Sequence, residues 1–514
     1  MATDLKRSMT GNPFSISYHS RGALLVYGDK RQLREVLPLL PAGLKTLVVS
    51  VGGVKDLPGK RHIQAVPGKV IQLRGHLGCF RASVESSEGL LDLGPLSPNR
   101  EELFDLVLDL YDHPLFGQEV PPLGYFRSRG SMDHLEAKLE QLAKLVGDVN
   151  KPRYFDFDEQ RCAHDRLGLN GCRQCLAACP AGALNSDAHE GIQIDPYLCR
   201  GCGSCVLVCP TGAVTYARPR PSVTLQKIAD LLEPLHRGKR LPSVLVVSAT
   251  STAALPESVP SLQVTAVGSV GIELWFAALA LGASRVIILR SGMLPPTTDR
   301  LLGQQVELAR SLLKAVGQAP ERISLIDDPE RMDWDGIPNS WSPLEINALS
   351  GHYEKRKLLL KSLKHIVSQQ GEKRESLQDS QFGRIEIHTS ACTLCHACSS
   401  ICPTGALIQR NGGLVLRASD CVQCGLCVAA CPENALASGS PISLDELLDG
   451  TEYLLKTGDE PFHCVKCGKA FATRSFVEGS IAHVRSHPMF QGDGIKLLQM
   501  CMECRQRETL EVNS

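Results

Sequence analysis

The sequence has no excess charge of either sign, few aromatic residues and no long hydrophobic run. Fifty-five basic side chains balance 55 acidic ones, and aromatic residues make up 5% of the 514 residues. The balanced charge gives no support for binding to nucleic acid or to an anionic membrane, and the scarcity of aromatic residues argues against surfaces that stack on bases. The most apolar stretch, 272–283, contains a glutamate and is much shorter than the ~20 residues of a membrane span. We therefore expect a buried helix there.

The chain also lacks the motifs of several enzyme classes. No G-x-G-x-x-G follows a predicted strand, and there is no P-loop and no nucleophile elbow. The first residues, MATDLKRSMTGNPF, lack the apolar core of a signal peptide, and no twin-arginine pair precedes an apolar run. These absences predict a cytoplasmic chain with no membrane span, no nucleic-acid partner and no catalytic residues of its own for two-electron chemistry.

Cysteine, by contrast, is abundant. Twenty of the 21 cysteines fall into three tight groups, and Cys79 stands alone. In a reducing compartment such grouping favours metal ligands over disulfides. Cys79 is expected to pack as a small buried residue.

A chain of this length is expected to form several domains, about three or four. Apolar runs and helical periodicity alternate outside the cysteine groups, which predicts α/β domains with a parallel sheet. The expected strands are 23–27, 46–51, 243–248, 262–267, 285–290 and 322–327, and the expected helices are 101–111, 135–149, 272–283 and 299–316. The expected segments are an α/β domain of unassigned role (1–150), a first cysteine block (151–220), a scaffold α/β domain (221–345), a basic helical linker with a solvated face (346–380), a second cysteine block (381–440) and a tail (441–514).

An internal repeat carries the strongest functional signal. Four times a cysteine group closes with Cys-Pro and an apolar turn, at Cys179, Cys209, Cys402 and Cys431. The second block contains two regular C-x2-C-x2-C-x3-C-P runs, which are Cys392, Cys395, Cys398 and Cys402, then Cys421, Cys424, Cys427 and Cys431. Three thiolates on one tight loop can bind three irons of a cubane, and the fourth iron needs a ligand from elsewhere. Zinc sites use ligands in spaced pairs and have no use for this triplet.

The second block resembles the two-cluster bacterial ferredoxins, in which the fourth cysteine of each run binds the other cluster. The resemblance implies two [4Fe–4S] clusters with crossed ligands. One would be held by Cys392, Cys395, Cys398 and Cys431, and the other by Cys421, Cys424, Cys427 and Cys402. Folding of such a module should depend on its clusters.

The first block departs from this pattern in one run. Its second run is regular, with Cys199, Cys202, Cys205 and Cys209, whereas Leu169 stands where the first run needs its leading cysteine. We interpret Cys162, ten residues before Cys172, as the missing ligand, displaced by a loop expansion of seven residues. The two ligand sets would then be Cys162, Cys172, Cys175 and Cys209, and Cys199, Cys202, Cys205 and Cys179. The alternatives are a three-iron cluster, or a cap by another group such as His164, with Cys162 merely structural.

The tail contains two C-x2-C pairs, Cys464 with Cys467 and Cys501 with Cys504. Four thiolates in two pairs are typical of a closed structural zinc site, here in a zinc-ribbon-like tail. A rubredoxin-like single iron is one competitor. The other is a zinc finger that uses His483 and His487 and leaves the second cysteine pair without a role; its 15-residue interval after Cys467 is longer than the usual ~12 residues.

Residues 262–327 are weakly similar to the delta subunit of methyl-viologen-reducing hydrogenase, through the stretch VTAVGSVGIELWFAALALGASRVIILRSG. That family has cysteines here for a [2Fe–2S] centre. This chain has none between Cys209 and Cys392, so only the scaffold is carried over.

We therefore expect a multidomain α/β plus α+β protein with two dicluster ferredoxin-like modules, four [4Fe–4S] clusters and one zinc. It would be a non-catalytic electron-transfer subunit with a redox donor and acceptor. The general resemblance is to multi-cluster ferredoxin proteins that are associated with formate dehydrogenases and hydrogenases. The alternatives are a maturation scaffold that delivers clusters or metal, and a reductase subunit whose catalytic cofactor lies on a partner chain.

Overall fold

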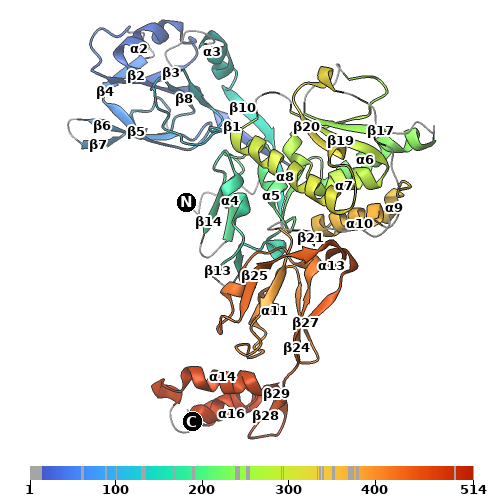
Figure 1. Cartoon of the computed structure of the whole chain (residues 1–514). Helices are drawn as coiled ribbons and strands as arrows, with labels where there is room; N and C mark the ends of the chain where they lie inside the picture. Colours follow the sequence, from blue (N-terminus) through green and yellow to red (C-terminus); the bar gives the residue numbers. More distant parts are fainter. Residues whose placement is uncertain are drawn as a thin grey trace.

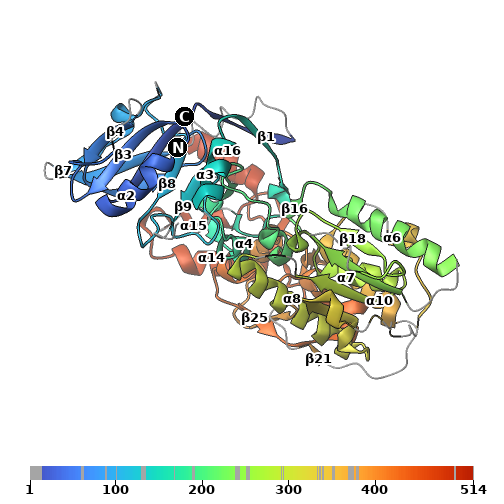
Figure 2. The same ribbon diagram turned by 90° about the horizontal axis from the view of Figure 1, so that it is seen from above.

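The N-terminal α/β domain and the C-terminal tail lie at opposite ends of the molecule, with the two cysteine blocks between them (Figure 1). Seen from above, the N-terminal and middle α/β domains are set apart from each other (Figure 2). This computed structural model describes residues 14–58, 63–86, 89–99, 101–128, 135–166, 168–187, 191–237, 243–249, 255–290, 292, 294–332, 334, 337, 341–349, 353–367, 376–377, 381–490 and 494–512. The signal-peptide expectation, which concerns residues 1–13, and parts of the linker lie outside the described residues. Among the described helices, none is both long and apolar enough to cross a membrane.

A five-stranded parallel sheet forms the centre of the N-terminal domain. Its order is β4 (Ile63–Pro67), β3 (Lys45–Val51), β2 (Ala23–Asp29), β8 (Leu106–Asp109) and β9 (Tyr125–Arg127). The central strands are Val- and Leu-rich and buried on both faces, as parallel strands normally are. An antiparallel sheet of β5 (Lys69–Arg74), β6 (Arg81–Ser86) and β7 (Gly89–Asp92) adjoins it. The strands expected at 23–27 and 46–51 are confirmed.

Two helix predictions in this domain need correction. Residues 101–111 contain strand β8 and no helix, because Leu106, Leu108 and Leu110 face one core while Phe104 and Val107 face another. Burial on two faces gives an apolar run that periodicity alone does not distinguish from a buried helix. The helix expected over 135–149 ends early: α3 covers Leu135–Ala143, and β10 (Gly147–Pro152) then pairs with β1 (Ser15–Ser20).

The middle domain has the parallel sheet that the sequence predicts. Its order is β18 (Ser261–Gln263), β17 (Ser243–Ser248), β19 (Ala283–Leu289) and β20 (Ile323–Ile326). Every residue of α7 (Ile272–Ala280) is buried, which confirms a buried helix in the most apolar stretch, and α8 (Pro296–Ala315) is close to its expected range. The strand expected over 262–267 is short, and α6 (Pro221–Arg237) is an additional helix.

The two cysteine blocks share one layout. In each, a terminal pair of antiparallel strands and an inner hairpin alternate with two short helices that follow cysteine loops. The first block has β11 (Phe155–Phe157), α4 (Gln174–Ala178), β14 (Leu184–Asp187), β15 (Gly191–Ile194), α5 (Ser204–Val208) and β16 (Val214–Tyr216). The second has β22 (Arg384–Ile387), α11 (Ala397–Ile401), β23 (Leu407–Arg410), β24 (Gly413–Arg417), α12 (Leu426–Ala429) and β25 (Leu436–Ser440).

The remaining elements connect these parts. The linker forms α10 (Lys355–Val367), which packs on α7 and α13 (Leu444–Asp449). The tail contains the hairpin of β28 (Pro461–His463) and β29 (Ala470–Thr473), followed by α14 (Arg474–Val484), α15 (Gly494–Leu498) and α16 (Met502–Val512). Helix α14 lies against the second block, where Thr473 Oγ1 donates to the carbonyl oxygen of Thr393 over 3.3 Å.

Candidate metal centres

The three regular cysteine loops share one backbone conformation. In each C-x2-C-x2-C triplet, the residues on either side of the middle cysteine have positive φ, at 76° and 82° for Gly201 and Gly203 and at 54° and 58° for Leu394 and His396. The third pair is Gln423, at 53°, and Gly425, at 80°. Such left-handed geometry costs an ordinary side chain about 1–3 kcal/mol and is typically retained at functional sites. The same turn occurs in three loops whose other side chains differ. This repetition indicates that the backbone adopts the turn in order to point the three thiols in one direction.

The second block gathers its eight cysteines into the two sets that the crossed pattern implies. Cys392, Cys395, Cys398 and Cys431 line one cavity, with about 360 Å³ of space between the atoms. Cys402, Cys421, Cys424 and Cys427 line another of about 340 Å³. In each cavity the fourth cysteine comes from the other run.

The first block repeats this arrangement despite its irregular motif. Cys162, Cys172, Cys175 and Cys209 line a cavity of about 340 Å³, which is the same volume as the cavity around Cys402. In the remaining set, burial raises the pKa of the Cys205 thiol, and the charges of Cys199, Cys202 and Cys179, and of Cys175 from the other set, raise it further. The structure therefore brings Cys162 together with Cys172, Cys175 and Cys209, and its role as a ligand stays a prediction.

His164 is placed differently from the solvated residue expected of a loop histidine. Its ring is 1% exposed. The ring nitrogens lie 2.9 Å from the carbonyl oxygen of Cys172 and 2.6 Å from Ser186 Oγ. Because both nitrogens are engaged, His164 has no free ligand atom, and the thiol of Cys162 is the better cap.

Hydrogen-bond donors point at the cysteine sulfurs in a repeated manner. The backbone amides of Ala183 and Ala435 donate to Cys179 Sγ and Cys431 Sγ, each over 3.3 Å. The hydroxyl groups of Thr211 and Thr404 lie 3.7 and 3.6 Å from the sulfurs of Cys209 and Cys402. Donors at sulfur are typical of iron–sulfur sites, where they stabilise the thiolate and raise the reduction potential.

Burial in these cavities disfavours the ionised form of the cysteine thiols. Burial, the largest cause, raises the pKa of the thiols of Cys172 to about 11 and of Cys175 and Cys398 to about 12. Neighbouring cysteines in the same cavity raise these pKa values further. Four thiols in one such cavity therefore stay largely protonated unless a bound cation supplies positive charge.

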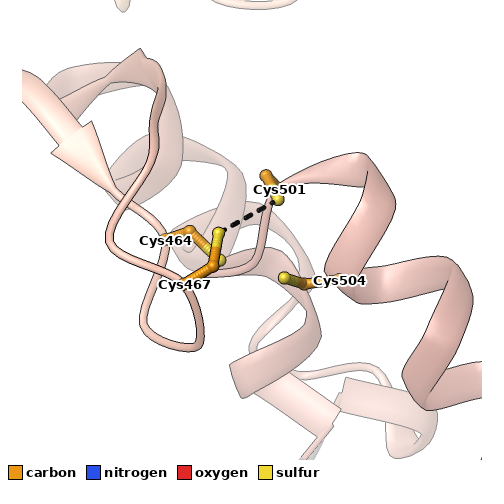
Figure 3. Close-up of side chains that lie close together, drawn as sticks. All are labelled: Cys464, Cys467, Cys501 and Cys504. Atoms are coloured by element: carbon orange, nitrogen blue, oxygen red, sulfur yellow. Dashed lines mark hydrogen bonds between the residues drawn. The ribbon is translucent and has the colours of Figure 1, made fainter.

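The tail brings together its four cysteines, whose sulfur atoms all lie within 4.8 Å of one another (Figure 3). Cys467 Sγ and Cys501 Sγ are 3.7 Å apart, close to the ~3.8 Å edge of a tetrahedron with 2.3 Å Zn–S bonds. Burial acts to raise the pKa of Cys464, but hydrogen bonds from the backbone of Cys501, Cys467 and Lys466 lower it to about 6. His483 lies apart from this group, with Nε2 3.8 Å from Glu433 Oε2. The geometry favours four thiolates over the finger that uses histidines.

Two side chains of the linker helix contact the cysteine modules, and the sequence analysis did not identify them. Lys355 Nζ donates to the carbonyl oxygens of Val206 and Leu207 over 2.6 and 2.9 Å, in the turn that leads to Cys209. Arg356 Nη2 donates to the carbonyl oxygen of Cys421 over 3.1 Å. The expected solvated basic face is therefore wrong for these two residues. The sequence does not single out Lys355 and Arg356, because they belong to a segment that contains several other lysines.

Comparison with known protein families gives two matches, each to a 4Fe-4S dicluster domain. One covers residues 170–213 and the other residues 391–436. The chain contains two 4Fe-4S dicluster ferredoxin domains. These domains support a role in iron–sulfur electron transfer. The first match begins after Cys162, which therefore lies outside the recognised motif. No curated protein matches the chain.

Proposed function

We propose that the protein carries four [4Fe–4S] clusters and relays single electrons within a cytoplasmic redox complex. The observation that carries this proposal is that twelve of the sixteen cysteines in the two modules line three cavities in sets of four. In the remaining set, the charges of Cys199, Cys202 and Cys179 act on Cys205. Each set draws three thiols from one region of its module and the fourth from the other run. The donors at sulfur and the need for positive charge in each cavity support the same conclusion.

In this proposal the four cluster sites are named by their cysteines. Site 1 is Cys179, Cys199, Cys202 and Cys205; site 2 is Cys162, Cys172, Cys175 and Cys209; site 3 is Cys402, Cys421, Cys424 and Cys427; site 4 is Cys392, Cys395, Cys398 and Cys431. The clusters supply reversible one-electron chemistry, and the chain binds, buries and tunes them. The α/β domains hold the modules, and the tail binds one structural zinc through Cys464, Cys467, Cys501 and Cys504.

The proposed partner is an oxidoreductase. The resemblance to multi-cluster ferredoxins points to a formate dehydrogenase or a hydrogenase, and no residue of this chain specifies one of them. The alternative role is a scaffold that hands its clusters to an oxidoreductase.

Reversible reduction distinguishes the carrier from the scaffold. The anaerobically purified chain is reduced with dithionite, reoxidised, and reduced again, with EPR spectra and iron content measured at each stage. A carrier should return the same signals with unchanged iron, and incubation with a metal-free acceptor ferredoxin should leave its iron in place. Transfer of iron to the acceptor would support the scaffold and contradict the carrier.

A further inference from the structure

The insertion in the first cluster motif makes direct contact with the second module. Between Cys162 and Cys172 the chain forms a small hairpin of β12 (Asp165–Arg166) and β13 (Leu169–Asn170). Strand β13 contacts α12 of the second module. A regular ferredoxin loop, with two residues between successive cysteines, would have no such hairpin.

An apolar cluster fills the contact. Ala163, Ile401 and Leu426 are 2%, 4% and 0% exposed, and Leu169 packs against them with Cys172 and Cys424. Leu169 therefore takes part in the contact at the position where the regular motif has a cysteine. This packing gives Leu169 a structural role at a position where the regular motif has a ligand.

The contact places site 2 next to site 3. Cys172 belongs to the first and Cys424 to the second, and both pack on the same three apolar residues. Those residues are also neighbours of ligands in the sequence, since Ala163 follows Cys162, Ile401 precedes Cys402, and Leu426 precedes Cys427. The charge of Cys424 also acts on Cys172.

The hairpin and the second module are closely packed at Gly171. A Cβ on Gly171 would lie 2.3 Å from the carbonyl oxygen of Ala163 and 2.7 Å from Leu426 Cγ. The glycine therefore lets the hairpin backbone approach the second module. Helix α10 supports the same arrangement, because Lys355 binds the first module and Arg356 binds the second.

We propose that the inserted hairpin joins the two modules into one electron path, with the electron crossing between sites 2 and 3 where Cys172 and Cys424 pack on one apolar cluster. This inference rests on the proposed function. One electron lost at one site is gained at the other, and no bond or proton changes place. Without the junction the chain would hold two separate pairs of clusters.

Leu169→Asp tests the junction in the full chain. A carboxylate is unfavourable in the apolar contact and should therefore separate the hairpin from the second module. Residue 169 is not one of the proposed ligands. The matched control is Asn170→Asp, which adds the same charge at the exposed neighbour on β13. Each protein is mixed with less than one equivalent of dithionite, and freeze-quench EPR follows the redistribution of electrons among the clusters. We expect redistribution to slow by about tenfold or more in Leu169→Asp and to be unchanged in Asn170→Asp.

Iron content and a second variant keep the outcomes distinct. If Leu169→Asp lowers the iron content, Leu169→Ala, which removes the apolar contact without adding a charge, is measured in its place and should slow redistribution. A Leu169 variant with its full iron and an unchanged rate would overturn the junction. Wild-type protein with about half of the expected iron would instead overturn the four-cluster proposal, so the two failures are distinguishable.

Discussion

Cys162 is the residue on which the assignment of site 2 depends. It lies outside the recognised dicluster motif, yet it lines the same cavity as Cys172, Cys175 and Cys209. Both ring nitrogens of the competing ligand, His164, form hydrogen bonds, one with the carbonyl oxygen of Cys172 and one with Ser186 Oγ. The chain therefore restores the number of thiols around this cavity although the spacing in the sequence is broken.

Replacing Cys162 by alanine should damage one cluster only. Site 2 would keep three thiolates, so the expected product is a three-iron centre with its characteristic EPR signal in the oxidised protein. Sites 1, 3 and 4 should retain four-iron signals. His164→Ala, the control, should leave all four clusters in place and cost about 1–3 kcal/mol of stability through the lost hydrogen bonds. Full four-iron signals in Cys162→Ala, together with cluster loss in His164→Ala, would show that the histidine is the ligand.

At the scale of elements, α10 is the part that holds the modules to the middle domain. Lys355 is buried and lies 3.9 Å from Glu273 Oε2 of α7, which is itself 1% exposed. Tyr353 donates to the other carboxylate oxygen of Glu273 over 2.7 Å. Within the described residues, Glu273 Oε2 has no hydrogen-bond partner, so Lys355 is its main source of compensating charge.

Lys355→Met should therefore destabilise the interface between α10 and the first module. Breaking a buried ion pair on one side leaves an uncompensated charge and costs about 3–5 kcal/mol. Thermal unfolding of the cluster-loaded protein, followed by the loss of cluster absorbance, should begin at a lower temperature. Lys357→Met is the matched control, because Lys357 is 66% exposed and pairs with Glu354 at the surface. Adding Glu273→Gln to Lys355→Met should recover part of the loss; equal unfolding of Lys355→Met and Lys357→Met would contradict the role of the pair.

The elements also show which features the sequence allows one to predict. The cysteine motifs predict four ligand sets, and the structure brings the thiols of three of them together; that these thiols bind clusters stays a prediction. Strands β2, β3, β17 and β19 were recognisable as short apolar runs. Strand β8 was mistaken for a helix, because burial on two faces removes the alternation that identifies a strand. The hairpin at Leu169 and the buried Lys355 depend on contacts between distant segments, which local patterns do not contain.

On the scale of the whole molecule, the proposed sites follow one another in space. Site 1 is covered by the middle domain, where a Cβ on Gly268 would lie 2.4 Å from the carbonyl oxygen of Cys202. Sites 2 and 3 meet at the junction, and site 4 lies beneath the tail, where Thr473 binds Thr393.

The metal content of the anaerobically purified chain tests the central claim most directly. Iron, acid-labile sulfide and zinc are quantified per chain, and the reduced protein is examined by EPR. Four cubanes and one four-thiolate site predict about sixteen irons, about sixteen sulfides and about one zinc. The reduced protein should show magnetically interacting [4Fe–4S] signals. Iron near eight per chain would mean that one module holds no clusters, and would contradict the account.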